Sequence, residues 1–216
     1  MTAKPRQPAS PPDEASLQDA ELEADVPGLA VGVGDPVPSV GLRASDGYLL
    51  NLRSFVGKQS VALLFFAAPT ASATQARRGN RLAESLAAGA RRLAAAGVAV
   101  VGVTCDNERQ QTDWIADHRW PYLLFSDERR SAVERVGIPL TVSGRNYNVA
   151  RPVFLIAGRD GLVDAIILDP EPEYVVDIVL AAVRRADGRD PDLVDASSST
   201  AAPPEDSAEQ PTLASS

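Results

Sequence analysis

Continuous apolar runs alternate with helical stretches along the middle of this chain. Three runs have the length of buried strands: SVALLFFAA from Ser60, VAVVGVTC from Val98 and PYLLFSD from Pro121. Segments with helical periodicity follow them, over 75–96, 108–118 and 128–138. Strands that alternate with helices are joined by right-handed crossovers and pair in parallel. The pattern therefore predicts an α/β fold, with helices on both faces of a mostly parallel central sheet.

The stretch RPVFLIAGRDGLVDAIIL, residues 151–168, carries two apolar runs on either side of Asp160-Gly161. Asp-Gly between alternating apolar runs is a strong signal for a tight hairpin turn. We therefore expect an antiparallel hairpin at the C-terminal side of the sheet. The segment EPEYVVDIVLAAVRR, which ends at Arg185, has an amphipathic helical pattern and completes the predicted domain.

The acidic character of the chain comes from its two ends. The net charge is -8, of which residues 1–30 contribute -4 and residues 186–216 contribute -6, which leaves +2 for the part between them. Both ends are rich in Pro, Ala and acidic residues, a composition that buries too little apolar surface to offset the entropy lost on ordering. We predict disordered acidic tails over 1–30 and 186–216 around one domain over 31–185.

Several classes of function find no support in the sequence. A basic stripe with interleaved aromatic residues is missing, so we do not expect nucleic-acid binding. The N-terminal residues lack the apolar stretch of a signal peptide, and the apolar runs are too short to span a bilayer, so we expect a cytoplasmic location without membrane contact. Cys105 is the single cysteine, which excludes an intramolecular disulfide and a multi-cysteine zinc site. We expect neither a metal nor a cofactor.

Five motifs follow one another in order from Val31 onward, and the likeness that they carry covers roughly Val33 to Arg185. They are VGVGDPVPSVGLRASDGYLLNLRSFVGK, VVGVTCDN, PYLLFSDE, VERVGI and RPVFLIAGRDG. In this order and spacing they resemble the alkyl hydroperoxide reductase and thiol-specific antioxidant family, the peroxiredoxin-like branch of the thioredoxin superfamily. The resemblance implies a thioredoxin-like fold and, as the activity of the family, thiol-dependent reduction of peroxides.

The catalytic cysteine of that family is missing from this chain. In the family, a Pro-x-x-x-Thr-x-x-Cys stretch follows the first core strand, and its cysteine attacks the peroxide O–O bond. Aligned on Phe65 and Phe66, this cysteine falls on Thr74, and the first cysteine of the related disulfide reductases falls on Thr70. A thiol can be activated to a thiolate, whereas a threonine hydroxyl does not ionise in the working range of proteins. Thr70 and Thr74 therefore mark a degenerate active-site pocket.

Arg151 and Cys105 are the remaining candidates for the site. The resemblance aligns Arg151 with the arginine that lies against the catalytic thiolate, which predicts a positive site near a helix N-terminus. The alternative is a surface arginine at the start of a strand. Cys105 ends a predicted strand at the edge where α/β sheets bind ligands. It is either a relocated redox thiol activated by Arg151 or a small buried side chain.

Two polar residues near these candidates have structural interpretations that we favour. His118 lies near the end of a predicted helix, where capping explains it more simply than a role as catalytic base. Asp106 is either an acid in the crevice or a cap for the helix over the segment NERQQTDW, and we favour the cap.

Two hypotheses about function follow. The first is a degenerate peroxiredoxin-like protein that acts by binding or assembly, either as a homodimer or with a protein partner that contacts the crevice or the tails. The second is a one-cysteine thiol oxidoreductase that uses Cys105 and an external reductant. The surroundings of Cys105 distinguish the two, because a reactive thiol needs solvent access and a lowered pKa.

Overall fold

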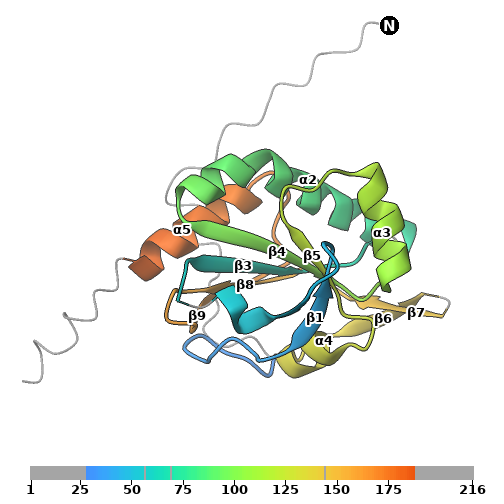
Figure 1. Ribbon diagram of the computed structural model, residues 1–216, viewed down its shortest axis with the longest axis horizontal. Coiled ribbons are helices and arrows are strands. Elements are labelled where there is room, and N and C mark those ends of the chain that lie inside the picture. The colour runs from blue at the N-terminus through green and yellow to red at the C-terminus, as the bar shows by residue number, and fades with distance from the viewer. Residues whose placement is uncertain (1–27, 56, 69, 144, 188–216) are drawn as a thin grey trace, which may run out of the picture.

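A seven-stranded sheet in the order β2-β1-β5-β4-β3-β8-β9 forms the centre of the molecule (Figure 1). The structure, a computed structural model, describes residues 28–55, 57–68, 70–143 and 145–187. The strands of this sheet are β1 (Gly41–Ala44), β2 (Leu49–Asn51), β3 (Ser60–Phe65), β4 (Val98–Thr104), β5 (Leu123–Ser126), β8 (Val153–Ala157) and β9 (Val163–Leu168). A separate hairpin consists of β6 (Leu140–Ser143) and β7 (Asn146–Val149).

The parallel part of the sheet is its centre. β3 pairs with β4 and β4 with β5 in parallel, while β1 and β2 on one side and β8 and β9 on the other pair antiparallel. Short turns join β1 to β2 and β8 to β9, and a tight turn can connect only antiparallel strands, so the pairing within each flank is antiparallel. The predicted Asp160-Gly161 hairpin is confirmed, with Gly161 at a φ of 83°. The predicted thioredoxin-like α/β fold is also confirmed.

Helices cover both faces of the sheet, as expected. α2 (Ala73–Ala95), α3 (Glu108–Asp117) and α5 (Val175–Asp187) lie on one face, and α4 (Ser131–Val136) and the 3-10 helix η1 (Leu52–Phe55) lie on the other (Figure 1). Successive side chains of a strand point to opposite faces. Leu64 of β3 therefore packs with the α2 side, while Leu63 and Phe65 pack with the α4 side. None of the described helices is both long and apolar enough to cross a membrane.

One element of the fold was not predicted, another begins later than predicted, and the predicted tails are not tested. The hairpin β6–β7 was not predicted. Its residues lie between the predicted helix over 128–138 and the predicted hairpin over 151–168. α4 begins at Ser131, later than the predicted 128–138, because the amide of Arg130 turns back to the carbonyl of Asp127 at 2.8 Å. The disordered tails predicted for 1–30 and 186–216 lie almost entirely outside the described residues, and they stay predictions.

Candidate functional site

The carboxyl ends of β3, β4 and β5 meet at one edge of the sheet, where α/β folds bind ligands. Backbone hydrogen bonds continue past the strands: Phe66 N donates to Val103 O at 3.2 Å, and Asp127 N donates to Thr104 O at 2.8 Å. The segments that follow the three strands are therefore held close together. They carry Thr70, Cys105 and Asp127.

Thr74 and Thr70 lie in different surroundings. Thr74 is exposed in the first turn of α2, where its hydroxyl oxygen accepts from Arg77 Nη2 at 3.5 Å. Thr70 lies in the loop before α2, partly buried, and its hydroxyl donates to Asp106 Oδ1. The threonine at the position of the family cysteine thus faces outward, and the other ties the loop to the end of β4.

Asp106 points into the interior and does not cap α3, so the predicted role as a cap is wrong. The side chain is 1% exposed, and the Ser126 hydroxyl donates to its backbone carbonyl at 2.7 Å. The cap of α3 is Asn107, one residue later, because the chain needs two residues after β4 to turn into the helix. Burial raises the pKa of Asp106, and the hydrogen bond from the Thr70 hydroxyl offsets part of this rise.

We expect Asp106→Asn to stabilise the protein by about 1 kcal/mol at pH 7, because it removes the cost of a buried charge. The Thr70 hydroxyl can still donate to the side-chain oxygen, and the new amide can donate to the Thr104 oxygen. The raised pKa means that folded Asp106 holds its proton at pH values where the unfolded chain has lost it. Wild-type stability therefore falls as pH rises from the usual Asp pKa of about 3.9 through the raised one.

Urea unfolding of both proteins between pH 4 and pH 8 measures this difference, which should grow with pH. Asp113→Asn on the exposed side of α3 is the matched control, and it should change the free energy of unfolding little. A variant at Asp106 that is less stable than wild type at pH 7 would show that the fold needs the carboxylate.

Cys105 has the surroundings of a protonated thiol. It follows β4 directly and is partly buried. Burial, and after it the charges of Asp127 and Asp106, raise the pKa of Cys105 to about 12, and the charge of Arg130 offsets only part of this. A reactive cysteine needs the opposite setting, open and electropositive. The thiol is therefore uncharged at neutral pH.

Arg151 lies beside α2 but apart from Cys105. The preceding residue, Ala150, accepts a hydrogen bond from Gln75 Nε2 at 3.4 Å, which places this backbone next to the first turn of α2. The Arg151 side chain is exposed and makes no hydrogen bond or ion pair with any residue that the structure describes. The arginine whose charge acts on Cys105 is Arg130. An anion site at Arg151 stays a prediction.

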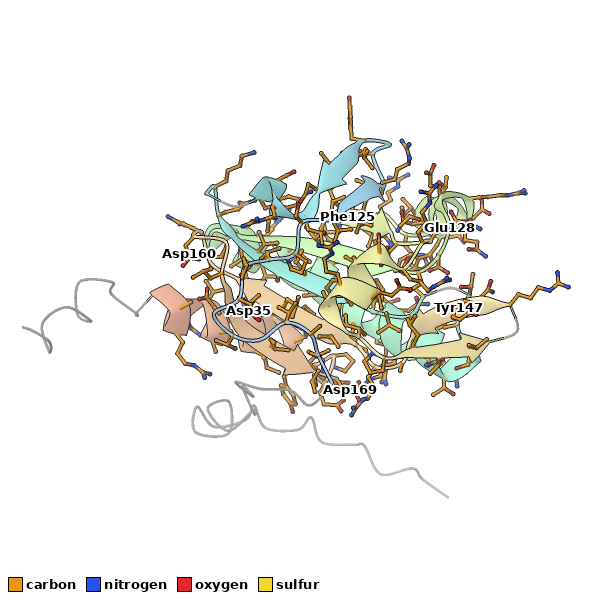
Figure 2. The ribbon with its side chains drawn as sticks, turned by 90° about the horizontal axis from the view of Figure 1, so that it is seen from below. Asp35, Phe125, Glu128, Tyr147, Asp160 and Asp169 are labelled. Atoms are coloured by element: carbon orange, nitrogen blue, oxygen red, sulfur yellow. The ribbon has the colours of Figure 1, made fainter. Side chains whose placement is uncertain are left out.

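A hollow of about 230 Å³ opens at this edge of the sheet, and we call it the strand-end hollow. Its described lining residues are Thr70, Cys105, Asn107, Gln110, Glu128, Arg130, Arg145, Asn146 and Tyr147. They come from the loop before α2, the start of α3, the segment before α4 and the hairpin β6–β7. Figure 2 shows Glu128 and Tyr147 at one end of the molecule and Asp160 at the other. Neither Thr74 nor Arg151 lines this hollow.

Arg130 reaches the hollow from an uncommon backbone conformation. Its φ is 59°, and its guanidinium lies over the Tyr147 ring, 4.3 Å from the ring centre. Asp127 fixes the turn, since its Oδ2 accepts from the amides of Ala132 and Val133 at 3.0 and 2.9 Å. Burial raises the pKa of Asp127, and these two bonds offset part of the rise.

Neither the role of Arg130 nor the hairpin that carries Tyr147 was predicted from the sequence. A signal for the hairpin existed, because Leu140 and Val142 alternate with polar residues before the turn, and Tyr147 and Val149 do so after it. The sequence does not show that Arg130 would stack on Tyr147, because the two residues lie in different elements.

The structural interpretation of His118 is confirmed. It is the C-cap of α3, with Nδ1 3.0 Å from the carbonyl of Trp114, and its ring stacks on Trp120 with centroids 4.9 Å apart. The hollow lies at the other end of α3, about 15 Å away for a helix of this length. His118 therefore cannot serve as a base for groups in the hollow.

The sequence model of the AhpC/TSA family matches residues 33–166. The chain belongs to the AhpC/TSA family. A Coxiella burnetii protein named as peroxiredoxin bcp is 25% identical over 141 residues, which are 64% of this chain and 89% of that protein. The resemblance seen in the sequence is thereby confirmed.

Solved peroxiredoxin structures share the fold of this AhpC/TSA chain. Peroxidoxin BcpB from Mycobacterium tuberculosis superposes with a TM-score of 0.62 at 21% identity, over 72% of this chain and 97% of that one. Peroxiredoxin Q from Xanthomonas campestris gives a TM-score of 0.59 at 16% identity, over 73% and 98%. At these identities the structures support the fold, while function must be argued from the site.

Proposed function

We propose that this AhpC/TSA chain no longer reduces peroxides through a thiol and acts by binding. The surroundings of Cys105 carry this proposal. Peroxide reduction begins when a thiolate attacks the O–O bond, forms a sulfenic acid and releases an alcohol or water. Cys105 is the single cysteine of the chain, and its pKa of about 12 leaves almost no thiolate at neutral pH.

Thr74 cannot take over the reaction. It occupies the family cysteine's position by alignment and lies in the first turn of α2. The helix N-terminus and Arg77 would favour an anion there, but a hydroxyl does not ionise in this range and forms no stable oxidation product. The first turn of α2 therefore offers a helix N-terminus and an arginine, but it carries no cysteine that could react with a peroxide.

The strand-end hollow supports the binding part of the proposal. Four chain segments contribute polar side chains to it, and Arg130 and Arg145 supply positive charge. A convergent set of polar groups in a concave site is the usual setting for ligand binding. Binding to a second copy of the chain or to another protein, through the crevice or the tails, stays a prediction.

Peroxide consumption tests the proposal. Hydrogen peroxide and an organic hydroperoxide are incubated with the protein, using dithiothreitol or thioredoxin as reductant, and Cys105→Ser is measured in parallel. We expect both proteins to match the rate without protein, because neither holds a thiolate near neutral pH. Turnover by wild type that is lost in Cys105→Ser would establish the one-cysteine oxidoreductase and overturn the proposal.

A further inference from the structure

Two of the amide side chains in the strand-end hollow are oriented with their donors free. Asn107 and Gln110 form a capping box, in which Asn107 Oδ1 accepts from the Gln110 amide at 2.9 Å and Gln110 Oε1 accepts from the Asn107 amide at 3.0 Å. Backbone N–H groups can only donate, so these bonds fix which end of each side chain faces the helix. Both NH2 groups are left without a hydrogen bond to any described residue, and both residues line the hollow.

Two arginines add donors and positive charge. Stacking on Tyr147 holds the guanidinium of Arg130, and its ion pair with Glu134 is long, at 3.8 Å. A non-glycine residue at positive φ persists only where its surroundings hold it, and such residues cluster at functional sites. Arg145 is exposed at the rim and has no ion pair with a described residue.

The negative groups restrict where a ligand can lie. Glu128 is the one carboxylate among the described lining residues, so the two arginines leave an excess of one positive charge. Asp106 and Asp127 act on Cys105 from the interior, so the floor of the hollow is unfavourable for an anion. The favourable part is the lining by Asn107, Gln110 and the two arginines, which are all at least partly exposed.

We propose that the strand-end hollow binds an oxyanion, the phosphate or carboxylate group of a small molecule, through Asn107, Gln110, Arg130 and Arg145. The inference rests on the proposed function and names its ligand class. Guanidinium groups match the geometry of carboxylate and phosphate oxygens, and the start of α3 adds a favourable dipole. A hollow of 230 Å³ is smaller than the usual drug-sized site, so it holds a small molecule or one group of a larger one.

Side-chain amide signals in 1H–15N correlation spectra test the proposal directly. The full chain is titrated with inorganic phosphate and, separately, with succinate, at constant ionic strength. We expect saturable shifts of the Asn107 and Gln110 NH2 signals. Saturation at lower phosphate concentration would assign the ligand to phosphate compounds, and saturation at lower succinate concentration would assign it to carboxylates.

Asn107→Asp is the decisive variant, because Asp caps a helix as well as Asn does but replaces the free NH2 group with a charged oxygen. We expect the Kd for phosphate or succinate to rise by at least about tenfold, because the variant loses a hydrogen-bond donor and adds a negative charge that repels the ligand. Gln59→Glu makes the same change in charge before β3, at the opposite end of the sheet, and should leave Kd unchanged.

Two results would overturn the inference. One is the absence of saturable shifts at millimolar phosphate and succinate. The other is an equal loss of affinity in Asn107→Asp and Gln59→Glu, which would show only a general effect of net charge. The titration contains no peroxide, so its failure leaves the proposed loss of peroxidase activity untouched, and turnover through Cys105 would overturn that proposal whatever the titration shows.

Discussion

Replacing Thr74 by cysteine in a Cys105→Ser background is expected to give this chain a reactive thiol. Thr74 is exposed in the first turn of α2, and Arg77 Nη2 lies 3.5 Å from its hydroxyl oxygen. A helix N-terminus and a nearby arginine lower a cysteine pKa from its usual value of about 8.5. We expect alkylation at pH 8 to be at least about a hundredfold faster than that of wild-type Cys105.

The matched control for this variant is Ala88→Cys in the same Cys105→Ser background. Ala88 is exposed on α2 but lies in the middle of the helix, where the dipole has little effect. Alkylation by iodoacetamide across pH 5–10 gives the midpoint of each thiol. The cysteine at position 74 should titrate at a lower pH than the one at position 88. Equal midpoints would show that the first turn of α2 no longer activates a thiol, so the site would have lost more than its cysteine.

The main elements of the fold could be predicted because each has a strong local pattern. β3 and β4 are continuous apolar runs, since both of their faces are covered, and the Asp160-Gly161 turn carries its own signal. The hairpin β6–β7 has a weaker pattern, because Val142 and Tyr147 form a cross-strand pair that faces outward. Exposed strands lack the apolar run that identifies buried ones.

The site was predictable in its position but not in its contacts. The alternation of strands and helices placed Thr70 and Cys105 at one edge of the sheet, as the structure confirms. Asp106 was misassigned because a one-residue difference decides whether a side chain after a strand points inward or caps the next helix. Arg130 acts on Cys105 across two separate loops, and no local pattern encodes such a contact.

Cys105 remains a protonated thiol near neutral pH. Burial is the largest cause, and the charges of Asp127 and Asp106 act in the same direction. A pKa raised from 9.0 to about 12 reduces the thiolate fraction at pH 7 by about a thousandfold relative to an unperturbed cysteine. The thiolate is the nucleophile, and a higher pKa makes the remaining thiolate more nucleophilic, so the alkylation rate should fall by a smaller factor, at least about tenfold.

The pH dependence of Cys105 alkylation in the native wild-type protein therefore reports whether this thiol is protonated, with Ala88→Cys in the Cys105→Ser background as the exposed reference. We predict that the Cys105 rate at pH 7 lies at least about tenfold below the reference, and that it still rises with pH beyond the midpoint of the reference thiol. A Cys105 midpoint below pH 8, with a rate at pH 7 equal to or above the reference, would rule out a protonated thiol and identify Cys105 as an active redox thiol.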